Sequence, residues 1–194
     1  MTRIALVLLA GLLAGCAGLA GRPTPAAGTA GIAALTGWVA AGRLAVAAGS
    51  EGGSGGFVWQ QQGPETRLRL RGPLGAGSFE IASDGERLSV TDAEGQVLGA
   101  DARATLRSRL GADLPLSSLR YWMIGLPDPA STARVIESEA TPLRIIEQHG
   151  WTIAYEAFTS TDGLALPARV TATSGDVRLR LTVSDWTDLR AAPE

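Results

Sequence analysis

The chain has 194 residues and a formal net charge of −2, a length that suits one domain with a sizeable core. All 17 basic residues are arginine, and the sequence contains no lysine and no asparagine. A P-loop lysine, a Schiff-base lysine and an Asn-linked glycan are therefore excluded, and the charge gives no reason to expect a nucleic-acid partner.

The N-terminus has the pattern of a bacterial targeting segment. Arg3 precedes an apolar run from Ile4 to Leu13, which is much shorter than the roughly 20 residues of a membrane-spanning helix. The tetrad Leu13-Ala14-Gly15-Cys16 resembles the bacterial lipobox, which implies cleavage before Cys16 and lipid attached to that residue. Cys16 is also the only cysteine, so no disulfide can form within the chain. We expect residues 1–15 to be a lipoprotein signal peptide.

Residues 16–34 are predicted to be a lipidated, flexible tether. They consist mainly of Ala, Gly, Pro and Thr, with few large apolar side chains to join a core. Ala17, rather than Asp, follows the cysteine, and by analogy with lipoprotein sorting rules this favours the outer membrane. We expect a lipid anchor on its periplasmic face, and a folded domain spanning residues 35–190.

The first half of that domain is predicted to be a series of short strands. A long strand at 38–47 has apolar residues of both parities, which leaves open which face points inward. The glycine-rich segment 49–56 is interpreted as a mobile hairpin turn, because neither a helix pattern nor a lysine follows it as in a phosphate loop. Further strands are expected at 57–62, 66–71, 77–83, 86–91 and 95–100, separated by turn residues.

One stretch of this sheet has a clear apolar face. Leu68 and Leu70 alternate with Arg67, Arg69 and Arg71, so that one face is uncharged and the other is wet. The side chains expected on the apolar face also include Phe57, Trp59, Phe79 and Ile81. Leu74, between Pro73 and Gly75, is expected to be exposed at a turn, which together with the apolar face suggests that the protein handles lipid.

Two helices are predicted next, at Asp101–Leu110 and Pro115–Ile124. The second has an apolar stripe containing Leu116, Leu119, Trp122 and Met123. Strands are expected again at 133–139, 143–149, 151–157, 167–173 and 177–183, with Asp185-Trp186 and a polar tail ending the domain. The predicted fold is mainly β, an incomplete (half-open) antiparallel β-barrel of about eleven strands with a helical lid enclosing a hydrophobic cavity.

Several motifs together resemble the LolB family. They are Gly42-Arg43, Phe57-x-Trp59-Gln60-Gln61, Gly72-Pro73-Leu74-Gly75 and Leu114-Pro115-Leu116-x-x-Leu119-Arg120-x-Trp122-x-x-Gly125-Leu126-Pro127, behind the lipobox. The resemblance covers essentially the whole mature domain and implies a half-barrel with a helical lid. It further implies an outer-membrane receptor that accepts lipoproteins from the periplasmic carrier LolA by binding their acyl chains, and inserts them into the outer membrane.

The expected site has no cofactor, no metal and no catalytic residue. The resemblance implies that Leu74 acts in a membrane-insertion loop, and that the partners are a LolA-like carrier, cargo acyl chains and outer-membrane phospholipid, with the protein a monomer. The residues predicted to form the acyl-chain cavity and its lid are Trp38, Phe57, Trp59, Leu68, Leu70, Phe79, Ile81, Leu119, Trp122, Leu126, Trp151, Tyr155, Leu179 and Leu181. For any single aromatic residue, an ordinary core position is an equally good interpretation.

Two other functions are weighed against this one. A structural or assembly lipoprotein of the envelope would bind protein partners rather than acyl chains. A hydrolase is less favoured, because the single histidine, His149, adjoins a turn beside Glu147 and the only cysteine is expected to be the lipid anchor.

Overall fold

The computed structural model describes residues 29–72, 77–110, 115–141 and 143–192. Cys16, most of the predicted tether and Leu74 lie outside these residues.

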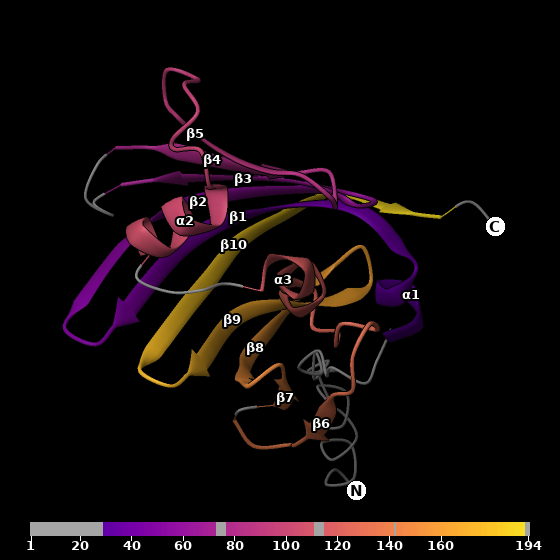
Figure 1. Cartoon of the computed structure of the whole chain (residues 1–194). Helices are drawn as coiled ribbons and strands as arrows, with labels where there is room; N and C mark the ends of the chain where they lie inside the picture. The colour runs from indigo at the N-terminus through magenta and orange to yellow at the C-terminus, as the bar shows by residue number, and fades with distance from the viewer. Residues whose placement is uncertain (1–28, 73–76, 111–114, 142, 193–194) are drawn as a thin grey trace, which may run out of the picture.

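One antiparallel sheet of ten strands dominates the fold (Figure 1). The strands are β1 (Leu35–Ala48), β2 (Glu51–Gln62), β3 (Glu65–Arg71), β4 (Phe79–Ser83), β5 (Leu88–Asp92), β6 (Arg134–Glu137), β7 (Arg144–Gln148), β8 (Trp151–Thr161), β9 (Leu164–Ser174) and β10 (Val177–Ala191). Their order is β5-β4-β3-β2-β1-β10-β9-β8-β7-β6, so the first and last strands pair in the middle. The sheet curls without closing, which confirms the half-open barrel.

The described residues contain three helices, α1 (Thr29–Ala33), α2 (Ala102–Leu110) and α3 (Leu116–Met123). The chain that joins β5 to β6, the two edge strands, carries α2 and α3 across the open side of the sheet, and α3 lies within the curl (Figure 1). Asp101 caps the N-terminus of α2, since its carboxylate accepts hydrogen bonds from the Arg103 and Ala104 amides at 2.9 and 3.2 Å.

The alternation predicted for β3 is confirmed, and it fixes the inner face of the sheet. Leu68 and Leu70 are buried while the three arginines between and beside them are exposed. The same inward side carries Trp38, Ala40, Leu44 and Val46 of β1, which decides the face that the sequence left open. Register shifts in the β1–β10 and β8–β9 pairs mark bulges, which increase strand twist and help the sheet to curl.

The structure differs most from the predicted elements in three places. Residues 95–100 form no strand, because Asp92 folds a tight turn by accepting hydrogen bonds from the Glu94 and Gln96 amides, leaving one bridge between Thr91 and Val97. The last strand passes Trp186 and ends at Ala191. The folded part starts before residue 35, because α1 lies in the predicted tether and buries Ile32.

The glycine-rich segment 49–56 is also corrected, because only Gly49 and Ser50 form the turn. From Glu51 onward the segment pairs with β1, and Gly55 lies opposite Leu44. Gly55 is buried, and a Cβ built on it would collide with the carbonyl oxygen of Arg71 in β3. The glycines therefore let two backbones approach closely, as glycine often does inside a strand.

This close approach predicts that alanine substitutions at two adjacent glycines have different effects on stability. Gly55→Ala should lower the free energy of unfolding by about 1–3 kcal/mol, because backbone must move to admit the methyl group. Gly56→Ala should be neutral or slightly stabilising, because the nearest atom to its added Cβ is 3.8 Å away. Urea unfolding of both variants checks this, and equal costs would contradict it.

Candidate functional site

The inner face of the sheet and the inner side of α3 form one apolar cluster. Most of the predicted cavity residues are buried in it: Trp38, Phe57, Trp59, Leu68, Leu70, Phe79, Ile81, Trp122, Trp151, Tyr155 and Leu179. The other three predicted residues, Leu119, Leu126 and Leu181, are partly buried and pack against it. The structure thus brings together every predicted cavity and lid residue.

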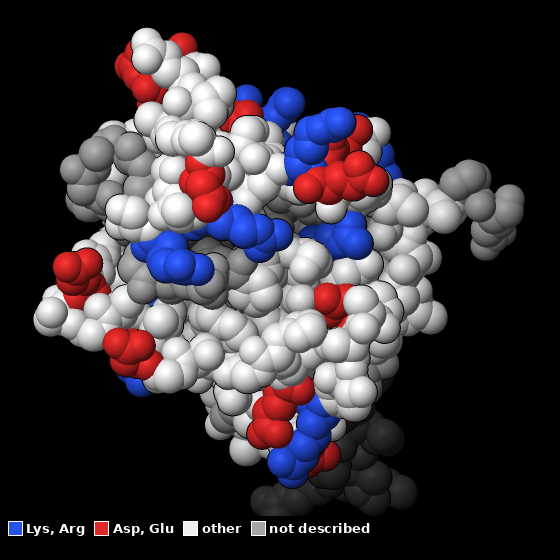
Figure 2. Space-filling view, in the orientation of Figure 1, with Lys and Arg blue, Asp and Glu red and all other residues white. Residues whose placement is uncertain are grey.

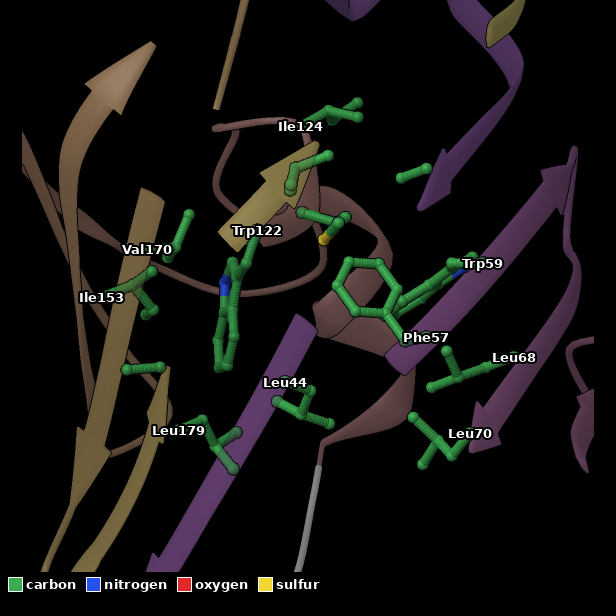
Figure 3. Close-up of a cluster of buried hydrophobic side chains, with 14 of the residues drawn as sticks. Leu44, Phe57, Trp59, Leu68, Leu70, Trp122, Ile124, Ile153, Val170 and Leu179 are labelled. Carbon is green, nitrogen blue, oxygen red and sulfur yellow. The ribbon is translucent and has the colours of Figure 1, made fainter. Parts of the chain in front are cut away.

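Trp122 of α3 occupies the centre of this cluster. In Figure 3 its indole stands between Ile153 and Val170 on one side and Phe57 and Trp59 on the other. Its ring centroid lies 6.3 Å from that of Trp151. The protein's own side chains therefore occupy the space between α3 and the sheet, and Trp122 of α3 is the central side chain.

A hollow of about 640 Å³ lies outside this cluster. It is lined mostly by polar residues at the ends of β1 to β5 and of β10, including Gln60, Arg67 and Asp84. Among the predicted cavity residues, only Trp38 contributes to its lining. This polar hollow is not the predicted acyl-chain cavity.

The Trp59-Gln60-Gln61 motif supplies polar groups at one end of the cluster. Gln61 is buried, and its side-chain oxygen accepts hydrogen bonds from the Trp59 indole at 3.1 Å and from the Thr66 hydroxyl at 2.7 Å. Its amide nitrogen donates to the Gly63 carbonyl oxygen at 2.9 Å. The buried indole nitrogen is thereby satisfied without opening the apolar face to water.

Gln148, at the end of β7, connects α3 and the turn after it to the sheet. Its side-chain oxygen accepts hydrogen bonds from the Trp122 indole and from the Asp128 amide, both at 2.8 Å. Its side-chain nitrogen donates to the Asp128 carbonyl oxygen and to the carbonyl and hydroxyl oxygens of Ser131, at 2.8–2.9 Å. We call Gln148 and these three partners the Gln148 clamp.

The carboxylate of Asp128 holds the same turn. It accepts hydrogen bonds from the Ser118 hydroxyl at 2.7 Å and from the Ala130 amide at 2.9 Å. Burial alone would raise the pKa of Asp128, but these hydrogen bonds and the nearby His149 outweigh it and lower the pKa below its usual 3.8. The carboxylate is therefore ionised at neutral pH.

Two further side chains fasten the C-terminal end of α3. The Tyr155 hydroxyl donates to the Trp122 carbonyl oxygen at 2.7 Å, and burial raises the pKa of this tyrosine so that it stays a neutral donor. The buried Arg144 donates to the Gly125 carbonyl oxygen and to Glu137, both at 2.6 Å. The carbonyl groups at the end of the helix thus have partners on β7 and β8.

His149 does not form a catalytic triad. Its Nε2 atom lies 2.9 Å from the Ser131 hydroxyl and 3.7 Å from the Asp128 carboxylate, so both partners approach one ring nitrogen. A triad needs the serine on one nitrogen and the acid on the other. Glu147, the predicted neighbour of His149, is instead paired with Arg134 at 3.3 Å.

Of the Gln148 clamp, the sequence analysis predicts only Trp122 and not the polar residues Gln148, Asp128 and Ser131. A signal was present, because Arg144, Ile146 and Gln148 share one parity and Ile146 marks it as inward. Polar residues at inward positions require buried partners. The segment Pro127-Asp128-Pro129 was a second signal, since an aspartate in a turn commonly bonds to an amide two residues on, as Asp128 does to Ala130.

Exposed charge is unevenly distributed on the face that carries α2. Figure 2 shows basic side chains gathered near the middle of this face and acidic ones mostly around its edge. Arg103 and Arg107 of α2 are both exposed. Within the described residues, the helices are all too short or too polar to cross a membrane.

A curled sheet with an apolar inner face under a helix defines a half-barrel protein, and comparison with known families agrees. The model of the family described as "Outer membrane lipoprotein LolB" matches residues 36–186. The chain is 34% identical over 188 residues to outer-membrane lipoprotein LolB of Ectopseudomonas mendocina, covering 92% of each chain. It is 32% identical over 190 residues to that of Chromohalobacter salexigens, covering 94% of this chain and 88% of the relative.

The chain therefore belongs to the LolB family of outer-membrane lipoproteins, which are receptors in lipoprotein transport and not enzymes. A solved LolA superfamily protein from Nitrosomonas europaea aligns with 81% of this chain and 87% of its own, at a TM-score of 0.48 and 12% identity. At this TM-score and sequence identity, the likeness supports no further statement about the fold.

The lowered pKa of Asp128 predicts a pH-dependent contribution to stability. Because the folded state favours the ionised carboxylate, the contribution is fully present above the usual pKa of 3.8 and is lost as the pH falls through the folded pKa. Asp128→Asn should lower the free energy of unfolding by about 1–2 kcal/mol at pH 7, and by less below pH 3.8. Urea unfolding from pH 7 to pH 2.5 measures both, with the exposed Asp185→Asn as control. A cost that did not change with pH would contradict it.

Proposed function

We propose that the protein accepts lipoproteins from a LolA-like periplasmic carrier, holds their acyl chains between α3 and the inner face of the sheet, and inserts them into the outer membrane. The observation that carries this proposal is the way the sheet is covered. Among the described residues, a large apolar face is covered by short helices, with α3 at the centre, rather than by a second sheet. Such a cover can be displaced without breaking any strand pairing.

The energetics favour an acyl chain as the replacement for part of α3. Each buried methylene group is worth about 0.8 kcal/mol, so a ligand must find a long apolar surface to bind well. Leu44, Leu70 and Leu179 lie on β1, β3 and β10, which gives such a surface across the middle of the sheet. Leu116 and Leu119 of α3 are only partly buried, so moving this part of the helix exposes the least additional apolar surface to water.

The membrane anchor and the loop that contains Leu74 complete the proposal. Cys16 is the lipidation site, and the residues between it and α1 tether the domain to the periplasmic face of the outer membrane as a monomer. A mildly acidic mature chain draws its membrane affinity from acyl chains and apolar contacts rather than from a polybasic patch. Leu74 enters the acyl layer during delivery.

An acyl-chain probe whose fluorescence rises in apolar surroundings tests the binding step. The wild-type protein should bind it, and Leu119→Glu should weaken binding at least about tenfold, because a charge would face the acyl chain. Ser117→Glu is the matched control, since Ser117 is exposed on the same helix and should leave binding unchanged. Absence of probe binding to the folded wild type would favour a structural or assembly lipoprotein that binds protein.

Leu74 separates acceptance of cargo from its delivery. Leu74→Glu should change the free energy of unfolding by less than about 0.5 kcal/mol and leave probe binding unchanged, as expected of a surface substitution. Transfer of a lipoprotein into liposomes should fall sharply, because a charged side chain in hydrocarbon costs several kcal/mol. Leu74→Met is the control and should deliver normally. Normal delivery by Leu74→Glu, or a loss of stability typical of a buried leucine, would contradict the role.

A further inference from the structure

The outer face of the sheet, which is turned away from α3, carries exposed arginines on its central strands. One row of register partners crosses five strands from β3 to β9 and reads Arg71, Gly56, Arg43, Thr182, Arg169. Alternate strands of a sheet lie about 10 Å apart, so the backbones of the three arginines in this row are separated by that distance. A glycine and a threonine fill the strands between them.

Two further rows, toward the β1–β2 turn, add Arg180 and Arg178 of β10. Their register partners and next neighbours on β1, β2 and β9 are all small: Ala45, Ser54 and Thr171 for Arg180, and Ala47, Gly52 and Thr173 for Arg178. Positive charge therefore stands on a surface of small, uncharged side chains. We call the five exposed residues Arg43, Arg71, Arg169, Arg178 and Arg180 the outer arginine group.

The described part of the protein does not neutralise this group. None of its guanidinium groups forms an ion pair with a carboxylate among the described residues. By contrast, Arg67 and Arg69, earlier in β3, are both paired with Glu80, at 3.3 and 2.7 Å. Glu156 of β8 lies beside the group, but its carboxylate accepts a hydrogen bond from the Thr171 hydroxyl at 2.7 Å. Like charges on neighbouring strands repel one another, and an anionic surface laid against them would relieve that repulsion.

The layout of the group fits an extended anionic surface rather than one small anion. A site for a single anion directs its donors at one point, whereas these arginines are spread over β1, β3, β9 and β10. Arginine binds phosphate oxygens in a bidentate manner, and each basic side chain close to an anionic membrane strengthens its attraction about fivefold. The relatives of this chain are outer-membrane lipoproteins, so a phospholipid bilayer is the extended surface close to it.

We propose that the outer arginine group binds the phosphate groups of anionic phospholipids in the periplasmic leaflet of the outer membrane, and so turns the outer face of the sheet toward the bilayer. The apolar inner face and α3 then point to the periplasm, from which a carrier arrives. The lipid anchor and apolar contacts supply the membrane affinity, while the arginines set the orientation. This inference rests on the proposed function for the anchor at Cys16 alone, and not for the binding of acyl chains.

Quenching of a fluorophore by acceptor-labelled lipid headgroups tests the orientation of the full mature chain anchored in vesicles. Because Cys16 carries lipid, one introduced cysteine can be labelled alone, either Ala47→Cys on the outer face or Ser117→Cys on α3, and both positions are exposed. In phosphatidylcholine vesicles that contain about one third phosphatidylglycerol, the label at position 47 should be quenched at least about twofold more than the label at position 117. At about 1 M salt, where the screening length is about 3 Å, the difference should disappear.

The same measurement in vesicles of phosphatidylcholine alone identifies the cause of the orientation. The difference between the two labels should be absent there, because the headgroups carry no net charge. Equal quenching of both labels in the presence of phosphatidylglycerol would overturn the proposal. A difference that persisted in phosphatidylcholine alone would overturn it too, since headgroup charge would then not produce it.

Paired substitutions separate the outer arginine group from net charge. Arg178→Gln with Arg180→Gln should remove most of the quenching difference. Arg87→Gln with Arg103→Gln changes the net charge equally at exposed positions outside the group, and should leave the difference unchanged. Equal losses from the two pairs would refute a specific role for the group, and if the first pair does not fold, the wild-type comparison of lipid compositions decides the matter. Headgroup-dependent orientation without binding of the acyl-chain probe would uphold this inference and refute the proposed cargo site, while probe binding without such orientation would do the reverse.

Discussion

A sheet with one apolar face and two unpaired edges must cover that face or expose it to water. Here β1 and β10 pair in the middle, which puts the edge strands β5 and β6 at opposite ends of the strand order. The chain leaves one edge and must reach the other, and the segment that makes this passage carries α2 and α3. Connectivity therefore delivers the covering helix to the open side, and burial of its apolar stripe holds it there.

A covering helix and an acyl chain make the same kind of contact with the sheet. Both offer aliphatic surface to the middle of the sheet, where the backbone groups of the strands are already paired with one another. The polar groups of the site are confined to its two ends, at Gln61 and at the Gln148 clamp. The middle of the sheet is left without a polar requirement, so it can exchange one apolar partner for another.

The elements that the sequence predicted correctly are those governed by local pattern. Alternation predicts that Leu68 and Leu70 point inward, and the apolar stripe of Leu116, Leu119, Trp122 and Met123 predicts α3. The predictions failed where tertiary geometry decides. Gly55 is a strand residue because two backbones meet there, which no local propensity records. Ile32 was assigned to a tether because its neighbours are small, yet one large apolar residue was enough to fix a short helix against the sheet.

The candidate site was predictable to a similar degree. Its apolar members follow from periodicity, which is why every predicted wall residue joins the cluster. Its polar members do not, because Gln148 acts through Trp122 and Asp128, which are 26 and 20 residues away in the sequence. Periodicity could show that Gln148 points inward, but only the folded structure shows what it binds.

The closed packing also bears on the direction of transfer in the proposed function. Carrier, receptor and membrane all offer hydrocarbon to the same methylene groups, so the gross gain of about 0.8 kcal/mol for each of them largely cancels between donors and acceptors. What remains is the cost that each site meets before it can bind. This protein must first separate part of α3 from a face that it already covers, and a binding-competent state that is populated only in part weakens apparent affinity by that fraction. A fluid bilayer has no such cover to remove. In the proposed function, the self-covered receptor therefore holds acyl chains more weakly than the membrane does, and this difference would release them toward the membrane without any need for nucleotide hydrolysis.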